Sequence, residues 1–264
     1  MLKRRDGLNW NQKLAEYHHH IGEVFDVSEL STEIINELQN LGDPAQAANL
    51  QRFFKTAKGE YGEGDKFLGV RVPVLRAFAK KYRDAWLEDV LEVLHSQYHE
   101  ARLLALYLLV ELFQKADDQG RSQIYDEYLA HVAYINNWDL VDSSALQIVG
   151  QYLFNKERSP LLELARSKNL WERRIAIIAS FYFIRHHDFK STLEISEILL
   201  NDKEDLIHKA VGWMLREVGN RSQSVEEQFL HRHYKEMPRT MLRYAIERFP
   251  EELRQSYLKG EIGE

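Results

Sequence analysis

Apolar residues recur at helical spacing along almost the whole chain, and this pattern constrains the fold more than any other feature of the sequence. Apolar stripes alternate with short polar links, as expected for a succession of amphipathic helices. The 264 residues contain 5 prolines and 13 glycines, and no segment shows the strict alternation of a half-buried strand. The sequence therefore predicts an all-α protein.

Capping residues indicate where the first helices begin. Ser31 opens a helix that runs to Gln39, and Asp43-Pro44 opens a second that runs to about Lys58. Four glycines between positions 59 and 69 predict a loop, and Pro73 lies in the first turn of the next helix. The remaining helices are expected at residues 84–96, 99–115, 121–133, 140–154, 159–167, 170–187, 190–200, 204–219, 223–235, 238–248 and 250–258.

A degenerate repeat relates three of these helices. Arg102, Arg174 and Lys209 each stand near the start of an apolar helix, and they are separated by 72 and 35 residues. These separations are close to two repeats and one repeat of a helix pair of roughly 35–45 residues. We therefore predict a superhelical solenoid of HEAT-like antiparallel helix pairs, forming one domain over residues 28–264, whose inner helices line a concave binding face. Residues 1–27 are polar and are predicted to be an extension that is partly disordered.

Composition excludes several classes of function. The chain has no cysteine, so it has no disulfide, thiolate nucleophile or zinc–sulfur site, which fits a cytoplasmic protein. The longest apolar run, residues 103–110, is far shorter than the roughly 20 residues of a membrane-spanning helix. Three consecutive histidines at 18–20 fan around a helix and make a poor metal cage. We expect neither a metal nor a cofactor.

Positive charge is concentrated in one segment of an otherwise acidic chain. The net charge of −6 is unlike that of most DNA-binding proteins, whereas the segment from Asp65 to Arg83 is strongly basic. This segment is either a phosphate-binding face or an ordinary solvated helix face. Its candidate DNA-binding side chains are Lys66, Arg71, Arg76, Lys80 and Lys81.

Two carboxylates and an indole lie together between Asn137 and Ser144. If a helix starts near Asp139, then Trp138, Asp139 and Asp142 all fall around its first turn. A carboxylate there can cap the helix, so an N-cap beside a buried tryptophan is one explanation. We expect Asp139 to be the cap and Asp142 to be the residue available for chemistry.

The solenoid would bring three motifs from successive repeats to the concave face. They are residues 138–142, 171–174 and 209–213, which together supply a carboxylate, a guanidinium and aromatic rings. Individually, Trp171 and Trp213 could be core aromatics, and Arg174 could form a surface or structural salt bridge. The loop at residues 60–65 lacks the ligand alternation of a calcium loop and the glycine spacing of a phosphate loop, so we interpret it as a helix connection.

In these motifs the chain resembles the AlkD-type DNA glycosylases of the bacterial DNA alkylation repair family, which are built from HEAT-like repeats. The resemblance extends roughly from Ser31 to Lys259. Its carriers, in order, are Phe67-Leu68-Gly69-Val70 followed by Pro73, Trp138-Asp139-Leu140-Val141-Asp142, Asn169-Leu170-Trp171-Glu172-Arg173-Arg174, and Lys209-Ala210-Val211-Gly212-Trp213-Met214-Leu215-Arg216-Glu217.

The resemblance implies a base-excision enzyme that removes cationic alkylated purines, such as N3-methyladenine and N7-methylguanine, from double-stranded DNA. It implies that Asp142 is the catalytic carboxylate, that Trp138 and Trp213 flank the sugar of the lesion, and that Arg174 binds a phosphate. Lys209 joins the expected DNA-binding set. Because no lysine is marked as a Schiff-base nucleophile, we expect a monofunctional enzyme. We also expect a monomer. The rival hypothesis is a non-catalytic HEAT-like module that binds DNA or a protein partner.

Overall fold

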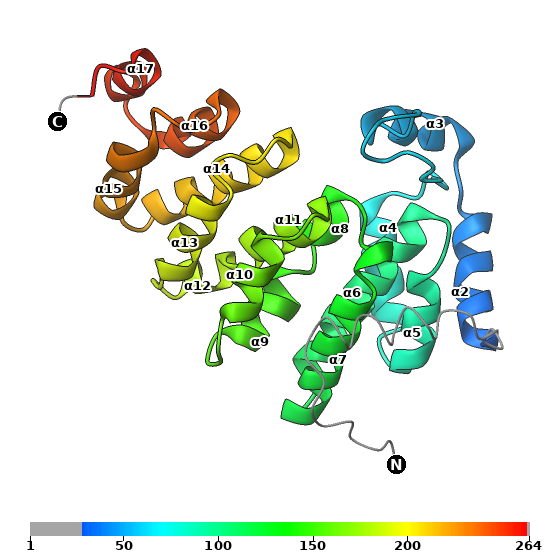
Figure 1. The fold of residues 1–264 in the computed structure, drawn as a ribbon. Helices are drawn as coiled ribbons and strands as arrows, with labels where there is room; N and C mark the ends of the chain where they lie inside the picture. The colour runs from blue at the N-terminus through cyan, green and yellow to red at the C-terminus, as the bar shows by residue number, and fades with distance from the viewer. Residues whose placement is uncertain (1–27, 263–264) are drawn as a thin grey trace.

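The computed structural model describes residues 28–262, which form a succession of helices arranged in space in the order of the chain (Figure 1). Within this range there is no β-strand, and one isolated bridge joins Lys66 to Tyr98. The all-α prediction is confirmed, while the predicted extension at residues 1–27 lies outside the described residues. The α-helices are α2 (Glu29–Asn40), α3 (Pro44–Phe53), α4 (Val72–Lys81), α5 (Leu87–Leu94), α6 (His99–Lys115), α7 (Asp118–Ala130), α8 (Trp138–Asp142), α9 (Gln151–Leu153), α10 (Ser159–Ala165), α11 (Leu170–Ala179), α12 (Phe181–Arg185), α13 (Lys190–Ile198), α14 (Asp205–Gly219), α15 (Gln223–His233), α16 (Arg239–Ala245) and α17 (Glu251–Lys259).

Two rows of helices build the solenoid. In the first, which we call the inner row, α4, α6, α8, α11, α14 and α16 each pack against the next. The second row packs against the first, with α5 on α6, α10 on α11, and both α13 and α15 on α14. Buried apolar side chains from Ile34 to Tyr257 form one continuous cluster between the rows. Each fully buried leucine or isoleucine in it contributes roughly 1.5–3 kcal/mol, so packing holds the stack together.

Local signals place the first helices with small errors. Asp43 is the N-cap of α3, as predicted, and its Oδ1 accepts hydrogen bonds from the backbone N–H groups of Ala45 and Gln46. The first helix begins at Glu29, two residues earlier than expected, because the hydroxyl of Ser28 caps it by accepting from the N–H of Ser31. Helix α3 ends at Phe53 and does not reach Lys58, because Lys55 adopts a left-handed backbone conformation with φ of 52°.

Two predicted long helices are interrupted. The helix expected at 140–154 consists of α8, a turn, a π-helical segment η2 (Leu146–Gly150) and α9. In the π segment the N–H of Gly150 donates to the carbonyl of Ala145, five residues back. The helix expected at 170–187 breaks at Ser180, a buried residue whose hydroxyl donates to the carbonyl of Ile177. Apolar periodicity continues across both breaks, so it did not reveal them.

A glycine allows α14 and α16, at the C-terminal end of the inner row, to approach each other closely. A Cβ at position 212 would lie 2.4 Å from the carbonyl oxygen of Met241 and 2.5 Å from the Cβ of Tyr244. These distances are far below ordinary contact, so only glycine permits this approach of α14 to α16. The sequence Lys209–Trp213 is therefore held against α16 by backbone-to-backbone packing.

Candidate functional site

Asp142 is the last residue of the short helix α8, one turn after Trp138. The N-cap is Asn137, whose Oδ1 accepts from the N–H of Trp138 at 2.8 Å, so the prediction that Asp139 is the cap was wrong. Asp139 uses its second carboxylate oxygen for a long-range contact to His99 instead. The helix also starts one residue before the predicted position, which leaves Asp142 and Trp138 on the same side of it.

Asp142 and Arg174 form a bidentate ion pair between α8 and α11. The Arg174 Nε donates to Oδ1 at 2.9 Å and Nη2 donates to Oδ2 at 2.8 Å. The remaining terminal nitrogen of Arg174 donates to the backbone carbonyl of Leu206 at the start of α14. Three inner-row helices therefore meet at one guanidinium. The Arg174 side chain is 6% exposed and that of Asp142 is 19% exposed, so the carboxylate is the more accessible partner.

The environment of Asp142 pulls its protonation equilibrium in two directions. Burial raises the pKa of the Asp142 carboxyl, and the nearby Asp139 adds to the rise, while the Arg174 guanidinium opposes both. Because the fork of Arg174 matches a carboxylate, the paired form at neutral pH is the anion. Each oxygen gives one lone pair to Arg174 and keeps acceptor capacity for a water molecule.

This geometry gives Arg174 a different contact from the one that the resemblance implies. Each of its three nitrogens donates one hydrogen bond to a protein acceptor, which uses three of its five N–H groups, and the side chain is 6% exposed. The structure favours Arg174 as the residue that holds Asp142 in place and balances its charge. The salt-bridge alternative for Arg174, left open by the sequence, is the contact that is present.

Aromatic rings surround Trp138. Its ring stacks on Phe54 at 5.3 Å between centroids, and Phe53 approaches its edge at 6.1 Å. Phe54 is buried, whereas Phe53 is 64% exposed at the end of α3. Both phenylalanines come from the segment just before the loop at residues 55–66, so this region folds back onto α8.

A buried charge network lies beneath the Trp138 ring. The imidazole of His99, at the start of α6, contacts Asp65 through Nδ1 at 2.9 Å and Asp139 through Nε2 at 2.8 Å. Arg102, one turn along α6, also donates to Asp65. The His99 ring is stacked on Phe67 at 4.5 Å between centroids. The network joins the loop, α6 and α8 at one point.

His99 is a cation in this network. Burial lowers the pKa of the imidazole, but the hydrogen bonds with Asp139 and Asp65 outweigh it and raise the pKa to about 9. Burial likewise works against ionisation of Asp65, but His99 and Arg102 hold the pKa of that carboxyl below its usual value. With both ring nitrogens donating, the imidazolium bridges two carboxylates at neutral pH.

The other predicted motifs lie further along the inner row. Trp171 is buried at 8% exposure, as the core alternative expected. Trp213 packs edge-on against Phe181 at 5.9 Å, and its indole N–H donates to Glu217 at 3.3 Å. Lys209 pairs with Asp205 at 2.7 Å on its own helix. Nothing in these contacts joins Trp213 to the Asp142–Arg174 pair.

Each of the three repeat cations is matched by a carboxylate. Arg102 pairs with Asp65, Arg174 with Asp142, and Lys209 with Asp205. Helices α6, α11 and α14 therefore share an ion-paired cation near their starts, in addition to a related position in the sequence.

The basic segment divides into two sides of α4. Lys66, Arg71, Arg76, Lys80 and Lys81 are all exposed. Arg76 lies close enough to Tyr107 of α6 to lower the pKa of its hydroxyl, so it is on the side of α4 that faces α6, and Lys80 lies one turn beyond it. Lys81 instead pairs with Glu37 of α2 at 2.6 Å, and Lys66 donates to Gln97. Lys81 is the least suited of the five to meet DNA, because its charge is already balanced.

Sequence reasoning missed Tyr61 and His99. Tyr61 belongs to the predicted helix connection, yet its ring lies 6.4 Å from that of Trp171, and the Trp138 side chain is close enough to act on the pKa of the Tyr61 hydroxyl. Electrostatic interactions also couple Tyr61 to Asp139 and to Lys209 of α14. The available signal was a tyrosine and three acids clustered before Phe67-Leu68-Gly69-Val70, but no periodicity shows where an irregular loop lies.

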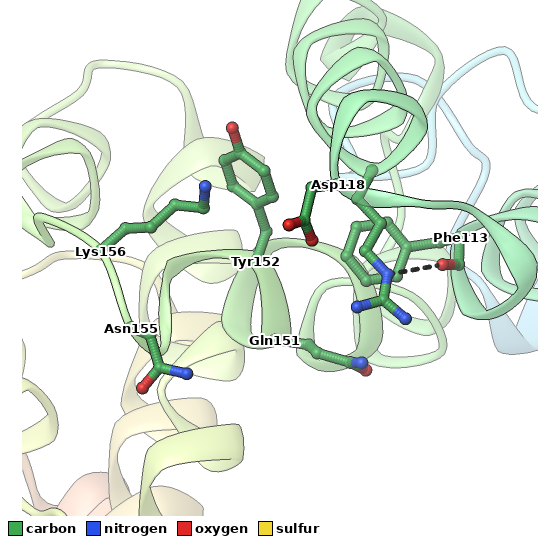
Figure 2. A pocket seen from close by; sticks show the side chains of 7 residues that line it. Phe113, Asp118, Gln151, Tyr152, Asn155 and Lys156 are labelled. Carbon is green, nitrogen blue, oxygen red and sulfur yellow. Dashed lines mark hydrogen bonds between the residues drawn. The ribbon is translucent and has the colours of Figure 1, made fainter.

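A cavity of about 290 Å³ lies elsewhere, between α6, α7 and the end of α9. Figure 2 shows Asp118, Tyr152 and Lys156 among the side chains that line it. It contains none of the predicted site residues, and Arg121 on its wall is held by the carbonyl of Phe113. We place the functional site at Asp142 because that location combines an accessible carboxylate, a buried cation and aromatic rings.

The described part of the chain has neither a cluster of metal ligands nor a membrane-spanning helix. Among residues 28–262, no three histidine, aspartate or glutamate side chains are grouped so as to hold a metal ion. No helix in that range is both long enough and apolar enough to cross a bilayer.

Comparisons with known proteins bear on the fold and on the family. A family model described as "DNA alkylation repair enzyme" matches residues 34–249. A solved structure titled "Predicted DNA alkylation repair enzyme from Enterococcus faecalis" superposes with a TM-score of 0.63 over 80% of this chain and 97% of its own, at 17% sequence identity. That identity supports a shared fold alone. The search of curated proteins gave no match.

Proposed function

The chain belongs to the DNA alkylation repair enzyme family, and we propose that it is a monofunctional DNA glycosylase that hydrolyses the N-glycosidic bond of cationic alkylated purines in duplex DNA. A role in DNA alkylation repair follows from the family. The glycosylase activity and substrates such as N3-methyladenine and N7-methylguanine are the proposal. The observation that carries it is the Asp142 carboxylate, held by Arg174 and still accessible beside the Trp138 ring.

The chemistry needs few groups. An N3- or N7-alkylated purine is already positively charged, so it leaves as a neutral base without a general acid. As the C1′–N bond breaks, its electron pair goes to the purine and positive charge develops on the deoxyribose. A preorganised carboxylate stabilises that charge, and an aromatic face adds cation–π attraction. Asp142 and Trp138 supply these two features one helical turn apart.

Water completes the reaction. The lone pairs of Asp142 that Arg174 leaves free can accept a hydrogen bond from a water molecule and orient its oxygen toward C1′. The water oxygen bonds to C1′, and its proton passes to Asp142 and then to solvent. The products are an abasic site, a neutral alkylpurine and one proton, so charge and atoms balance.

The monofunctional assignment is supported by the state of Lys209, the lysine of the third repeat motif. A hydrogen bond with Asp205 raises the pKa of Lys209, so this amine stays protonated and is a poor nucleophile. Attack by lysine on C1′ requires the neutral amine. The proposal therefore uses water and leaves Lys209, with the exposed Arg71, Arg76 and Lys80, for contact with the phosphate backbone.

The decisive experiment measures base release. Duplex DNA carrying N3-methyladenine or N7-methylguanine is incubated with wild type and with Asp142→Asn, and the free alkylbase is quantified under single-turnover conditions. We expect release by the wild type and a loss of about 100-fold or more in the variant, because the amide cannot balance the developing charge.

The matched control is Asp202→Asn. Asp202 forms an ion pair of the same kind with Arg173 at 2.6 Å, and its side chain is 6% exposed. That variant tests the loss of a buried Asp–Arg pair away from Asp142 and should keep near wild-type release. Wild-type protein that binds the DNA and releases no base above background would favour the non-catalytic binding module.

A further inference from the structure

The short helix α8 carries two carboxylates, and each of them is bound by a cation from a neighbouring inner-row helix. Arg174 of α11 donates two hydrogen bonds to Asp142, at 2.9 and 2.8 Å. His99, at the start of α6, contacts Asp139 through Nε2 at 2.8 Å. The two acids are three positions apart on one helix, so their charges are close neighbours. The packing of α8 on α6 and on α11 is therefore reinforced by one ion pair on each side.

The imidazole of His99 has a fixed place in the fold. Its side chain is 2% exposed, and its other ring nitrogen, Nδ1, contacts Asp65 at 2.9 Å. Asp65 also pairs with Arg102, so the charge of Asp65 has a second cation beside it. Within residues 28–262, Asp139 forms an ion pair with His99 alone. The charge of Asp139 is therefore balanced by this one ring.

The same imidazole supports the Trp138 ring from below. The centroid of the His99 ring lies 4.9 Å from that of Phe54 and 4.5 Å from that of Phe67. Phe54 in turn stacks on Trp138 at 5.3 Å between centroids. His99 therefore acts on both groups of the proposed reaction through one intervening residue each. Phe54 connects it to the indole, and Asp139 connects it to the helix that carries Asp142.

Three tyrosines also interact electrostatically with the acids of α8. Burial raises the pKa of each of their hydroxyls, so all three are uncharged at neutral and acid pH. The charged groups that act on the Asp142 carboxyl are Arg174, which lowers its pKa, and Asp139, which raises it. The three tyrosines are Tyr61 of the loop between α3 and α4, Tyr107 of α6 and Tyr128 of α7.

We propose that His99 is a positioning residue for the Asp142 site, which holds α8 against α6 through Asp139 and balances the negative charge of Asp139. This inference rests on the proposed glycosylase function and deepens it. An unbalanced Asp139 would favour the protonated form of Asp142, because two like charges on one helical turn repel each other. With His99 charged, Asp142 stays ionised and is the carboxylate of α8 that acts on the charge developing at C1′.

The test is the pH dependence of base release, because the proposed reaction needs the anionic form of Asp142. Release of N7-methylguanine from duplex DNA is measured in single turnovers from about pH 4.5 to about pH 8, and release without protein is subtracted. The rate should fall as pH falls through the pKa of Asp142. The midpoint of this fall is compared among wild type, His99→Gln, Asp139→Asn and the variant that carries both changes.

The two single variants should move the midpoint in opposite directions. His99→Gln keeps a donor toward Asp139 and removes the positive charge, so the midpoint should rise by about half a pH unit or more. Asp139→Asn removes the negative charge and should lower the midpoint. The double variant removes both charges and should return the midpoint close to that of wild type. A purely structural role for His99 predicts neither the opposite signs nor the cancellation.

The matched control is His131→Gln, which changes another buried histidine, at the end of α7, and should leave the midpoint in place. Thermal unfolding checks that each variant is folded. If His99→Gln is not folded, Asp139→Asn, which keeps the imidazolium, provides the test. Equal midpoints in wild type and in the folded single variants, or shifts of the same sign, overturn the role of His99 and leave the proposed function standing.

Failure of the proposed function is recognised separately. Absence of base release by wild type overturns the glycosylase function itself. The carboxyl-carbon NMR signal of Asp142, identified by its loss in Asp142→Asn, then gives the midpoint of its titration without any activity. That signal should show the same two opposite shifts, and unchanged titration in both variants would show that His99 does not balance Asp139.

Discussion

Glu226 is the residue in the described part of the chain whose burial is least compensated. It is 1% exposed on α15, and its Oε1 has no hydrogen-bond partner. Burial, reinforced by the neighbouring Glu227, raises the pKa of its carboxyl from 4.5 to about 9, against the opposing effect of Arg216. The folded protein therefore keeps this proton at neutral pH, whereas the unfolded chain releases it.

The raised pKa of Glu226 makes the folded protein less stable as pH rises. A carboxyl whose pKa is higher in the folded state reduces stability as pH rises through the interval from about 4.5 to about 9. At pH 7 the loss relative to acid conditions is roughly 3 kcal/mol for this one group. We predict that Glu226→Gln is more stable than wild type at pH 7 and close to it at pH 4.5. Urea unfolding at both values measures this.

Glu194→Gln serves as the control, because it changes a partly exposed carboxylate on another helix, α13, that pairs with Lys190 at 3.9 Å. It should leave the pH dependence of stability nearly unchanged. Equal destabilisation of Glu226→Gln at both pH values would show that the carboxylate is ionised and paired in the folded protein.

At the scale of residues, the sequence located one half of the candidate site. Asp142 and Arg174 were expected on one concave face because their motifs come from successive repeats, and the structure joins them in an ion pair. Trp138 was expected near Asp142 because the two residues are four positions apart on one helix. Tyr61 and Asp65 were interpreted as parts of a connection, because the direction of a loop side chain depends on partners distant in sequence, here Trp171 and His99. No local pattern encodes those partners.

At the scale of elements, His99 makes α6 the link between the loop and α8. Its pKa of about 9 in the folded protein lies above the ordinary value of 6.5, so the charged form stabilises the fold. This contribution is fully present below about pH 6.5 and is lost as pH rises through about 9. Its size is roughly 3 kcal/mol, since the group is 2% exposed and poorly screened.

We predict that His99→Gln, compared with wild type, loses more stability at pH 6 than at pH 9.5. The reason is that wild type has the charged imidazolium at pH 6 and has largely lost it at pH 9.5. Chemical unfolding at the two pH values gives the comparison. His131→Gln changes another buried histidine, whose ring stacks on that of His95 at 4.9 Å, and serves as a control for the loss of a ring. A pH-independent loss in His99→Gln would mean that the bridge between Asp65 and Asp139 forms with a neutral imidazole.

Regular helices were predicted accurately, whereas interrupted helices were predicted as continuous ones. Helix α6 spans residues 99–115 as expected, because its apolar residues form an uninterrupted pattern. The predicted helix at 140–154 was interrupted by η2, and that at 170–187 by Ser180, since an inserted residue or a serine that bonds back to a carbonyl barely alters an apolar pattern. Hydrogen-bonding details of single residues decide such breaks.

At the scale of the whole molecule, charge placement governs how an acidic protein can meet DNA. The net charge of −6 repels a polyanion at long range, and the cations of the repeat are matched by Asp65, Asp142 and Asp205. Binding must then rely on the remaining exposed cations, among which Arg71, Arg76 and Lys80 of the α4 region stand out.

Adjacent lysines on α4 provide a direct test. Lys80→Glu should weaken binding to duplex DNA and reduce the slope of log K against log salt by about 1. Lys81→Glu should change the slope less, because Glu37 already balances Lys81 at 2.6 Å. Fluorescence anisotropy titrations over a range of salt concentrations measure both slopes. Equal slopes for the two variants would remove this face of α4 from the DNA-binding surface.

The π-helical turn after Asp142 has a practical consequence for any comparison of related sequences. The hydrogen bond from Gly150 to Ala145 spans five residues, so one more residue occupies this turn than in an α-helix. A helical wheel drawn from Asp142 through to Leu153 is therefore out of phase by about 100° beyond the insertion, the rotation of one residue. An ungapped alignment to a relative with a regular helix will pair correct positions on one side of this turn and shifted ones on the other.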